Sequence, residues 1–195
     1  MIVRILLVVL LMIPVKVSAN NTGQDNSKGQ ITTRLGLSYI PAGNIKFTNR
    51  DATYDIYDSM AFRVSMEYFV SDLFSIGPSF EYLSRQIEPY AFFEEDIRMY
   101  SFYLDFRINH GLTDSGGNYL VFGVGTGGGS LSEAEGESDG GFGLYGVVGL
   151  DIALQESIGL ELLYRFQTAR FIIEERDYRF DGSALQAGLS YRIKI

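Results

Sequence analysis

Apolar and polar residues alternate one by one through most of the chain beyond residue 30. A period of two places successive side chains on opposite faces of a β-strand, and no convincing helical period follows the N-terminal stretch. Eight segments carry the alternation: 31–40, 59–70, 73–85, 98–109, 118–128, 141–154, 157–168 and 182–195. The pattern predicts an all-β protein built from eight antiparallel strands.

The connections between these segments alternate strictly in length. Short ones follow the second, fourth and sixth segments, at 71–72, 110–117 and 155–156. Long ones follow the first, third, fifth and seventh, at 41–58, 86–97, 129–140 and 169–181. An up-and-down sheet with this order has every long loop at one edge and both chain ends at the other.

The N-terminal stretch has the layout of a cleavable export signal. Arg4 is followed by a short apolar run, and Val17, Ser18 and Ala19 are small residues suited to cleavage. The run is too short to cross a bilayer as a helix, which needs about 20 residues. We expect a signal peptide at 1–19, a polar periplasmic leader at 20–29 and a barrel at 30–195.

Alternation alone does not say which face of the sheet is buried, because a slip of one residue exchanges the faces. A soluble barrel turns its apolar face inward, whereas a membrane barrel turns it toward lipid. The segments are long enough for tilted membrane strands, which need about 9–11 residues. Together with the one-sided long loops, this length favours a transmembrane β-barrel over a secreted, soluble lipocalin-like barrel.

The C-terminal segment alternates to its last residue, as a strand that closes a barrel against the first strand should. Gln186, Gly188, Tyr191 and Ile193 resemble the C-terminal assembly signal of bacterial outer-membrane barrels, although the chain ends on Ile195 rather than Phe. The mature chain is similar to the small OmpA/OmpX-type barrel domains. The resemblance implies an eight-stranded barrel in the outer membrane of a Gram-negative bacterium, inserted by the outer-membrane assembly machinery.

The polar face of the strands carries charges of both signs. An eight-stranded barrel has room for side chains but hardly for water, so these charges are expected to pair and fill the lumen. The basic members are Arg34, Arg63, Arg85, Arg107, Arg165, Arg192 and Lys194, and the acidic members are Glu67, Glu81, Asp105, Asp151 and Glu161. A gated pore is the alternative. From their places along the strands, Glu67, Asp105, Asp151, Glu161, Arg107 and Arg192 are expected to cluster in the half of the barrel near the short turns.

Acidic residues gather in two of the long connections. The first group is Glu94, Glu95 and Asp96, and the second is Glu133, Glu135, Glu137 and Asp139. Clustered carboxylates suit Ca²⁺ or Mg²⁺, which could also bridge to lipopolysaccharide phosphates. The spacing is not that of an EF-hand and solvated acidic loops are common, so the second group is only a weak metal candidate.

Signals for catalysis or cofactors are weak. Gly123, Gly125 and Gly128 satisfy G-x-G-x-x-G, but an acidic loop follows where a nucleotide site needs a helix. His110, the single histidine, falls at a predicted short turn. The chain has no cysteine, so a disulfide or thiolate metal site is impossible. We expect no cofactor and no enzymatic activity.

Outward-facing aromatic residues cluster toward both ends of the strands and suggest two interfacial girdles. The net charge of −8 argues against binding to nucleic acid. The expected partners are outer-membrane lipid and lipopolysaccharide, and the expected state is a monomer. The first functional hypothesis is a structural or surface-interaction role, such as adhesion, through the long external loops. Narrow, porin-like passage of small or hydrophobic solutes is the alternative.

Overall fold

The computed structural model describes residues 28–41, 43–47, 52–56, 58–87, 95–112, 118–132, 139–173 and 176–194. The predicted signal peptide and most of the predicted leader lie outside these residues. The elements are β1 (Gln30–Ile40), β2 (Gly43–Phe47), β3 (Ala52–Ile56), β4 (Ser59–Phe69), β5 (Phe74–Ile87), β6 (Glu95–Gly111), β7 (Tyr119–Ser132), β8 (Asp139–Ala153), β9 (Ile158–Ile173) and β10 (Arg176–Lys194).

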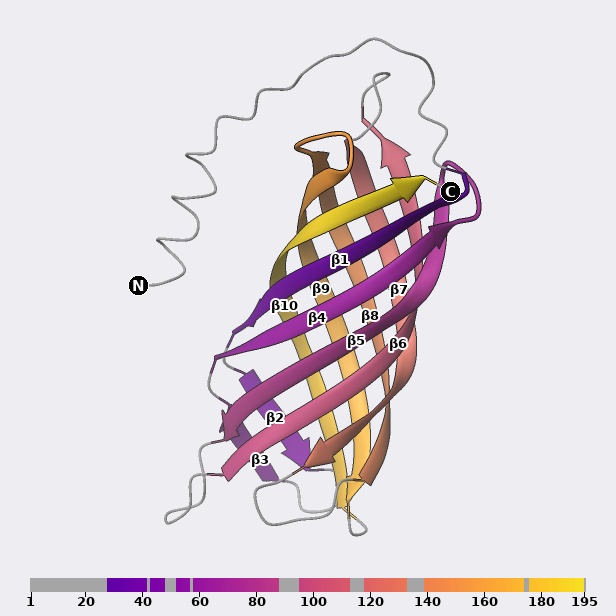
Figure 1. The fold of residues 1–195 in the computed structure, drawn as a ribbon. Coiled ribbons are helices and arrows are strands. Elements are labelled where there is room, and N and C mark those ends of the chain that lie inside the picture. The colour runs from indigo at the N-terminus through magenta and orange to yellow at the C-terminus, as the bar shows by residue number, and fades with distance from the viewer. Residues whose placement is uncertain are drawn as a thin grey trace.

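Eight of these strands form a closed antiparallel ring in the order β1, β4, β5, β6, β7, β8, β9, β10. Closure comes from β10, which pairs with β1 from Gln30 opposite Lys194 to Tyr39 opposite Leu185. The C-terminus and the start of β1 consequently lie together at one end of the barrel (Figure 1). The predicted eight-stranded up-and-down barrel is confirmed.

The two faces of the wall differ sharply in polarity. Large apolar side chains point outward and remain exposed, such as Phe102 at 65 % and Leu189 at 55 %. Arginine and carboxylate side chains point inward, and Arg165 and Glu161 are fully buried. This is the arrangement of a barrel surrounded by lipid, and it rules out the soluble lipocalin-like alternative.

One long connection was wrongly expected to lack strands. Within 41–58 the strands β2 and β3 form a hairpin. It lies on the edges of β10 and β5 beyond the ends of β1 and β4, with Arg179 opposite Lys46 and Ile56 opposite Ile87. Each strand is only five residues long, which is too short to give a clear alternation in the sequence. The hairpin therefore extends the barrel wall at the end opposite the C-terminus and the start of β1 (Figure 1).

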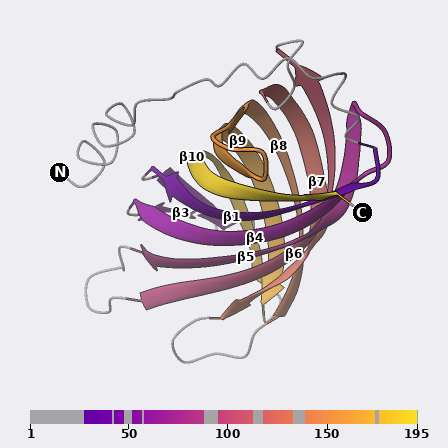
Figure 2. The same ribbon diagram turned by 45° about the horizontal axis from the view of Figure 1, so that its top comes forward.

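The connection expected at 169–181 is mostly strand as well. β9 continues to Ile173 and β10 begins at Arg176. Inward-facing apolar side chains stabilise this extension, since the rings of Phe171 and Phe180 meet edge to face with centroids 5.6 Å apart. Figure 2, in which the top of Figure 1 is turned toward the viewer, shows the strands curving around one interior.

The described residues contain no helix long and apolar enough to cross a membrane.

Candidate functional site

The interior of the barrel is the part of the molecule with concentrated chemistry. Period-two strands bring one side chain inward at every second position, and closure of the ring brings together residues far apart in sequence. The buried inward charges fall into two successive layers along the barrel, and a layer of apolar side chains lies beyond them toward the long loops. We name them the turn-side layer, the central layer and the loop-side layer.

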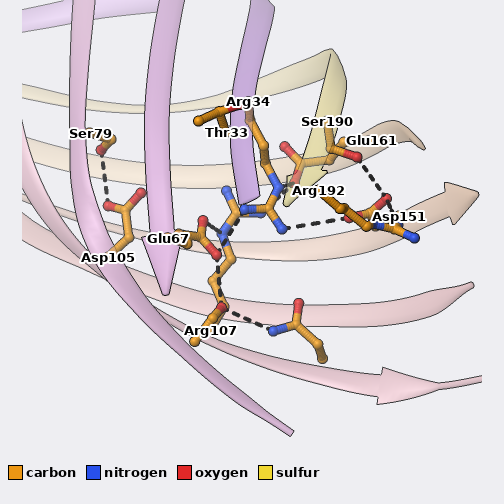
Figure 3. Close-up of polar contacts among 12 residues, drawn as sticks. Thr33, Arg34, Glu67, Ser79, Asp105, Arg107, Asp151, Glu161, Ser190 and Arg192 are labelled. Carbon is orange, nitrogen blue, oxygen red and sulfur yellow. Dashed lines mark hydrogen bonds and ion pairs between the residues drawn. The ribbon is translucent and has the colours of Figure 1, made fainter. Parts of the chain in front are cut away.

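The turn-side layer consists of Arg34, Glu67, Arg107, Asp151, Glu161 and Arg192, all buried. Arg34 on β1 reaches three carboxylates: its guanidinium lies 2.9 Å from Glu67, 3.0 Å from Glu161 and 3.5 Å from Asp151. Figure 3 shows this guanidinium at the centre of the cluster. A single arginine thus links the first strand to the carboxylates of β4, β8 and β9.

Arg107 closes the same cluster from the opposite wall. Its Nε lies 2.9 Å from Glu67, and its Nη1 donates to Glu161. Arg34, Glu67, Arg107 and Glu161 therefore form a ring of alternating charge across the lumen. A buried charge is tolerated when it is paired and hydrogen-bonded, and each member of this ring has two opposite charges.

The remaining pair lies nearest the turn-side mouth. Arg192 donates to Asp151 at 2.7 Å, and the guanidinium of Arg192 lies 5.4 Å from the ring centre of Tyr119. Ser190 also donates to Asp151. The layer as a whole holds three arginines and three carboxylates, so its formal charge is zero.

The central layer consists of Arg63, Glu81, Asp105, Arg165 and Tyr145. Arg63 lies 2.6 Å from Asp105, while Arg165 donates to both carboxylate oxygens of Glu81. The hydroxyl of Tyr145 donates to Asp105 and accepts from Arg63. With two arginines and two carboxylates this layer is also neutral.

Tyr145 organises the central layer by its ring as well as by its hydroxyl. The guanidinium carbons of Arg63 and Arg165 each lie 4.4 Å from its ring centre. Cation–π attraction lets two like charges share a single aromatic residue in a water-poor interior. The ring occupies space that Gly125 leaves, because a Cβ at residue 125 would overlap it.

The loop-side layer is apolar. Its members are inward-facing and buried, and they are Ile40, Ala61, Leu83, Met99, Ala169, Phe171, Phe180 and Ala184. Sequence reasoning missed this layer because it took the inward face of every strand to be polar. The signal was present in the alternation, since Leu83 and Met99 fall at the inward positions of their strands.

The structure does not bring all the predicted charges into one cluster. Asp105 belongs to the central layer and contacts Arg63, Ser79 and Tyr145. Figure 3 shows its hydrogen bond from Ser79. The side chains of Arg85 and Lys194 lie outside the described residues. Tyr103 and Tyr145 are two interior residues for which the sequence suggested no role.

The second acidic group, which was the weak candidate for a metal site, falls outside the described side chains. Glu133, Glu135 and Glu137 lie outside the described residues, as does the side chain of Asp139. Among the side chains that are described, no group of three or more His, Asp or Glu residues could hold a metal ion.

The residues proposed as an assembly signal occupy both faces of β10. Gln186 points inward and donates to Glu161 at 3.0 Å, and Gly188 lies against the backbone of Leu35 and Gly36. Tyr191 and Ile193 point outward and are about half exposed. Gln186 contacts the turn-side layer and Gly188 contacts β1, while the outward members belong to the lipid-facing surface.

Two solved structures share this architecture. The outer membrane protein OprG from Pseudomonas aeruginosa superimposes with a TM-score of 0.67 at 13 % identity, covering 89 % of this chain and all of its own. Neisserial surface protein A superimposes with a TM-score of 0.59, also at 13 % identity, covering 86 % of this chain and all of its own. At this low identity, the superpositions show a common fold alone.

Comparison with the curated proteins finds no match. A family model does match: it is described as the outer membrane protein beta-barrel domain, and it spans residues 5–192. The match covers all of the ring except the last two residues of β10, and the lipid-facing apolar surface agrees with it. The protein lies in the outer membrane, and the chain belongs to the outer membrane protein beta-barrel domain family.

Proposed function

We propose that this protein is a non-enzymatic, non-conducting barrel that acts at the cell surface through its external end. The observation that carries the proposal is the pair of neutral layers across the lumen. Every described charge in them has an opposite partner within 4 Å, so the interior is built as a plug.

The packing around the charges supports the same proposal. Gly125 and Gly143 do not open a passage, because the rings of Tyr145 and Tyr103 occupy the space beside them. The two rings also contact each other edge to face, with centroids 5.1 Å apart. An ion would have to displace these rings and break buried pairs to cross.

The external role draws support from the wall at the loop end. The β2–β3 hairpin and the extensions of β9 and β10 continue the sheet beyond the ends of β1 and β4. A hydrogen-bonded rim of this kind presents the connecting loops on a firm base, which favours recognition over free motion.

Conductance in planar bilayers tests the closed lumen. We expect no current steps from the full-length protein. We expect current steps from the double variant Tyr145→Ala with Arg165→Ala, because it lacks both the aromatic ring at the middle of the lumen and the ion pair of Arg165 with Glu81. Steps from the wild type with the size of an aqueous pore would overturn the non-conducting assignment.

Adhesion of intact cells tests the external role. Cells that display the wild type are compared with cells that display a variant whose residues 43–56 are replaced by a short Gly-Ser linker. We expect more wild-type than variant cells on wells coated with fibronectin or laminin, at equal surface expression. Equal adhesion by both strains and by the empty host on both coatings would contradict an adhesive role.

A second candidate, uptake of small apolar solutes, has one observation in its favour. The loop-side layer gives the external half of the lumen an apolar lining. Binding of a small aromatic fluorophore tests it: Leu83→Glu with Met99→Glu should abolish the binding, whereas Gly182→Ala should leave it unchanged. No saturable binding by the wild type would remove this candidate.

A further inference from the structure

A hollow interrupts the lipid-facing surface of the wall between β5 and β9. Its volume is about 670 Å³, and its surface is almost entirely apolar. Phe106, Phe122 and Phe166 border it with exposed rings, which belong to the outward faces of their strands. The hollow is therefore separate from the three layers inside the lumen.

The hollow lies where one outward position lacks a side chain. Five neighbouring strands contribute a row of register partners, which are Ile76, Phe106, Val124, Gly146 and Phe166. Gly146 is the one glycine of this row, and a Cβ there would lie 3.8 Å from its nearest contact, the carbonyl oxygen of Gly123. The space between Val124 and Phe166 is consequently open. We call this feature the Gly146 hollow.

The Gly146 hollow runs obliquely from the turn end toward the middle of the wall. Phe74, at its lower border, is the first residue of β5, whereas Phe166 is the ninth of the 16 residues of β9. Both strands begin directly after a tight turn, so the border climbs along the wall from β5 to β9. The short turns of an outer-membrane barrel lie on the periplasmic side. The hollow therefore faces the periplasmic leaflet, which is built from glycerophospholipids.

An empty hollow is unfavourable at this depth. Hydrocarbon contains no water to fill it, and side chains beside a void lose their dispersion contacts on that side. A flexible acyl chain can enter the space and contact the wall on several sides at once. Because the hollow is continuous with the lipid-facing surface, acyl chains are the molecules that surround it.

We propose that the Gly146 hollow is a binding site for one acyl chain of a glycerophospholipid from the periplasmic leaflet. The glycerol end of the chain lies near Phe74, and the methyl end lies between Val124 and Phe166. Recognition is by shape and dispersion, so the headgroup contributes little to it.

The chain offers a matched pair of variants. Gly146→Leu fills the hollow, because its side chain extends into open space. Ala187→Leu is the control, since Ala187 is an outward-facing small residue of β10 that does not border the hollow. Its register partners are Leu37 and Leu162. Both variants add one leucine to the lipid-facing wall, but only the first changes the hollow.

Native mass spectrometry of the full-length protein in detergent micelles measures the binding. The probes are phosphatidylethanolamine and phosphatidylglycerol with identical acyl chains, and glycerophosphoethanolamine, which carries no chains. We expect saturable binding of both lipids with similar affinity and no competition from glycerophosphoethanolamine. Gly146→Leu should weaken the binding by about fivefold or more, and Ala187→Leu should leave it unchanged.

Photolabelling in phospholipid vesicles tests the direction of the chain. A diazirine near the glycerol end of the chain should label the region of Phe74, and one near the methyl end should label the region of Phe166. The reverse order would assign the hollow to a lipid of the opposite leaflet and overturn the proposal.

Four binding results would also overturn it: no saturable binding, competition by glycerophosphoethanolamine, equal losses from both leucine variants, or no loss from Gly146→Leu. A dimer that Gly146→Leu dissociates would assign the hollow to a second copy of the chain instead. Heat-dependent gel mobility verifies folding. Val124→Phe, which narrows the same hollow from β7, replaces Gly146→Leu if that variant fails to fold.

Discussion

At the residue scale, this protein depends on pairing between buried charges. Arg165 and Glu81 are both essentially inaccessible to water. Without Arg165, Glu81 would retain only the guanidinium of Arg63, at 3.7 Å. The cost of breaking such a pair exceeds the benefit of forming it, because desolvation is paid by both members. Replacing one member of a buried ion pair is therefore expected to cost more stability than replacing both members together.

Arg165→Met is expected to lower the free energy of unfolding by about 3–5 kcal/mol, because Glu81 loses its bidentate partner. Adding Glu81→Leu should recover most of that loss, since the double variant contains no orphaned charge at this place. Urea unfolding in micelles followed by circular dichroism provides the measurement, because the chain has no tryptophan. Asp181→Asn, in an exposed pair, should change stability by no more than about 1 kcal/mol. A double variant as unstable as the single one would contradict the pairing argument.

Gly125→Val is expected to destabilise the barrel by about 1–3 kcal/mol or more, because the new side chain overlaps the ring of Tyr145. Gly182→Val provides the comparison, since a Cβ there meets no atom within 4 Å. The gel-shift temperature of the two variants, measured side by side, reports the difference. A G125V barrel as heat-resistant as the wild type would show that the central layer repacks freely.

At the element scale, the eight-stranded ring and the β2–β3 hairpin contribute differently to the barrel. The ring is complete without β2 and β3, because β1 pairs with both β4 and β10. The hairpin is attached by a few pairs to β10 and by a single pair to β5. Closure in lipid depends on β10, whereas the hairpin adds height at the loop end.

Replacing residues 43–56 by a short Gly-Ser linker should therefore leave a folded, heat-modifiable barrel in the outer membrane. Deleting residues 190–195 should prevent folding, because Gln30 to Arg34 of β1 would lose their partners in hydrocarbon. Fractionation of cells and gels run with and without boiling distinguish the two outcomes. Loss of the barrel in the hairpin variant would mean that β2 and β3 are part of the closure.

At the scale of the whole molecule, the wall is sorted into an apolar exterior and a paired interior, and the two ends are unlike. One end has the C-terminus beside the start of β1, and the other has the β2–β3 hairpin (Figure 1). The apolar loop-side layer lies at the hairpin end. An outer-membrane barrel places its long connections outside the cell.

Single cysteines test this orientation cleanly, because the chain contains none of its own. A membrane-impermeant maleimide should label Gly140→Cys, at the exposed loop-side start of β8, on intact cells. It should label Glu156→Cys, in an exposed turn at the other end, only after the cells are broken. Labelling of residue 156 but not 140 on intact cells would reverse the orientation.

Much of this molecule follows from a period of two in the sequence. The alternation from Leu35 to Tyr39 or from Phe102 to Ile108 determines both the strand and its two faces, because consecutive Cβ atoms point in opposite directions. The length of the segments indicated strands that cross a bilayer, and a sheet in lipid closes because open edges are too costly there.

Only the tertiary structure decided which inward residues meet. Arg34 contacts Glu161 because the strands are staggered around a closed ring, and that stagger is not written in the spacing of the two residues. The same holds for Asp105 in the central layer, for the hairpin that continues the wall, and for Gly146 between Val124 and Phe166. Alternation fixes the face on which a side chain lies, whereas register and closure fix its height and its neighbours.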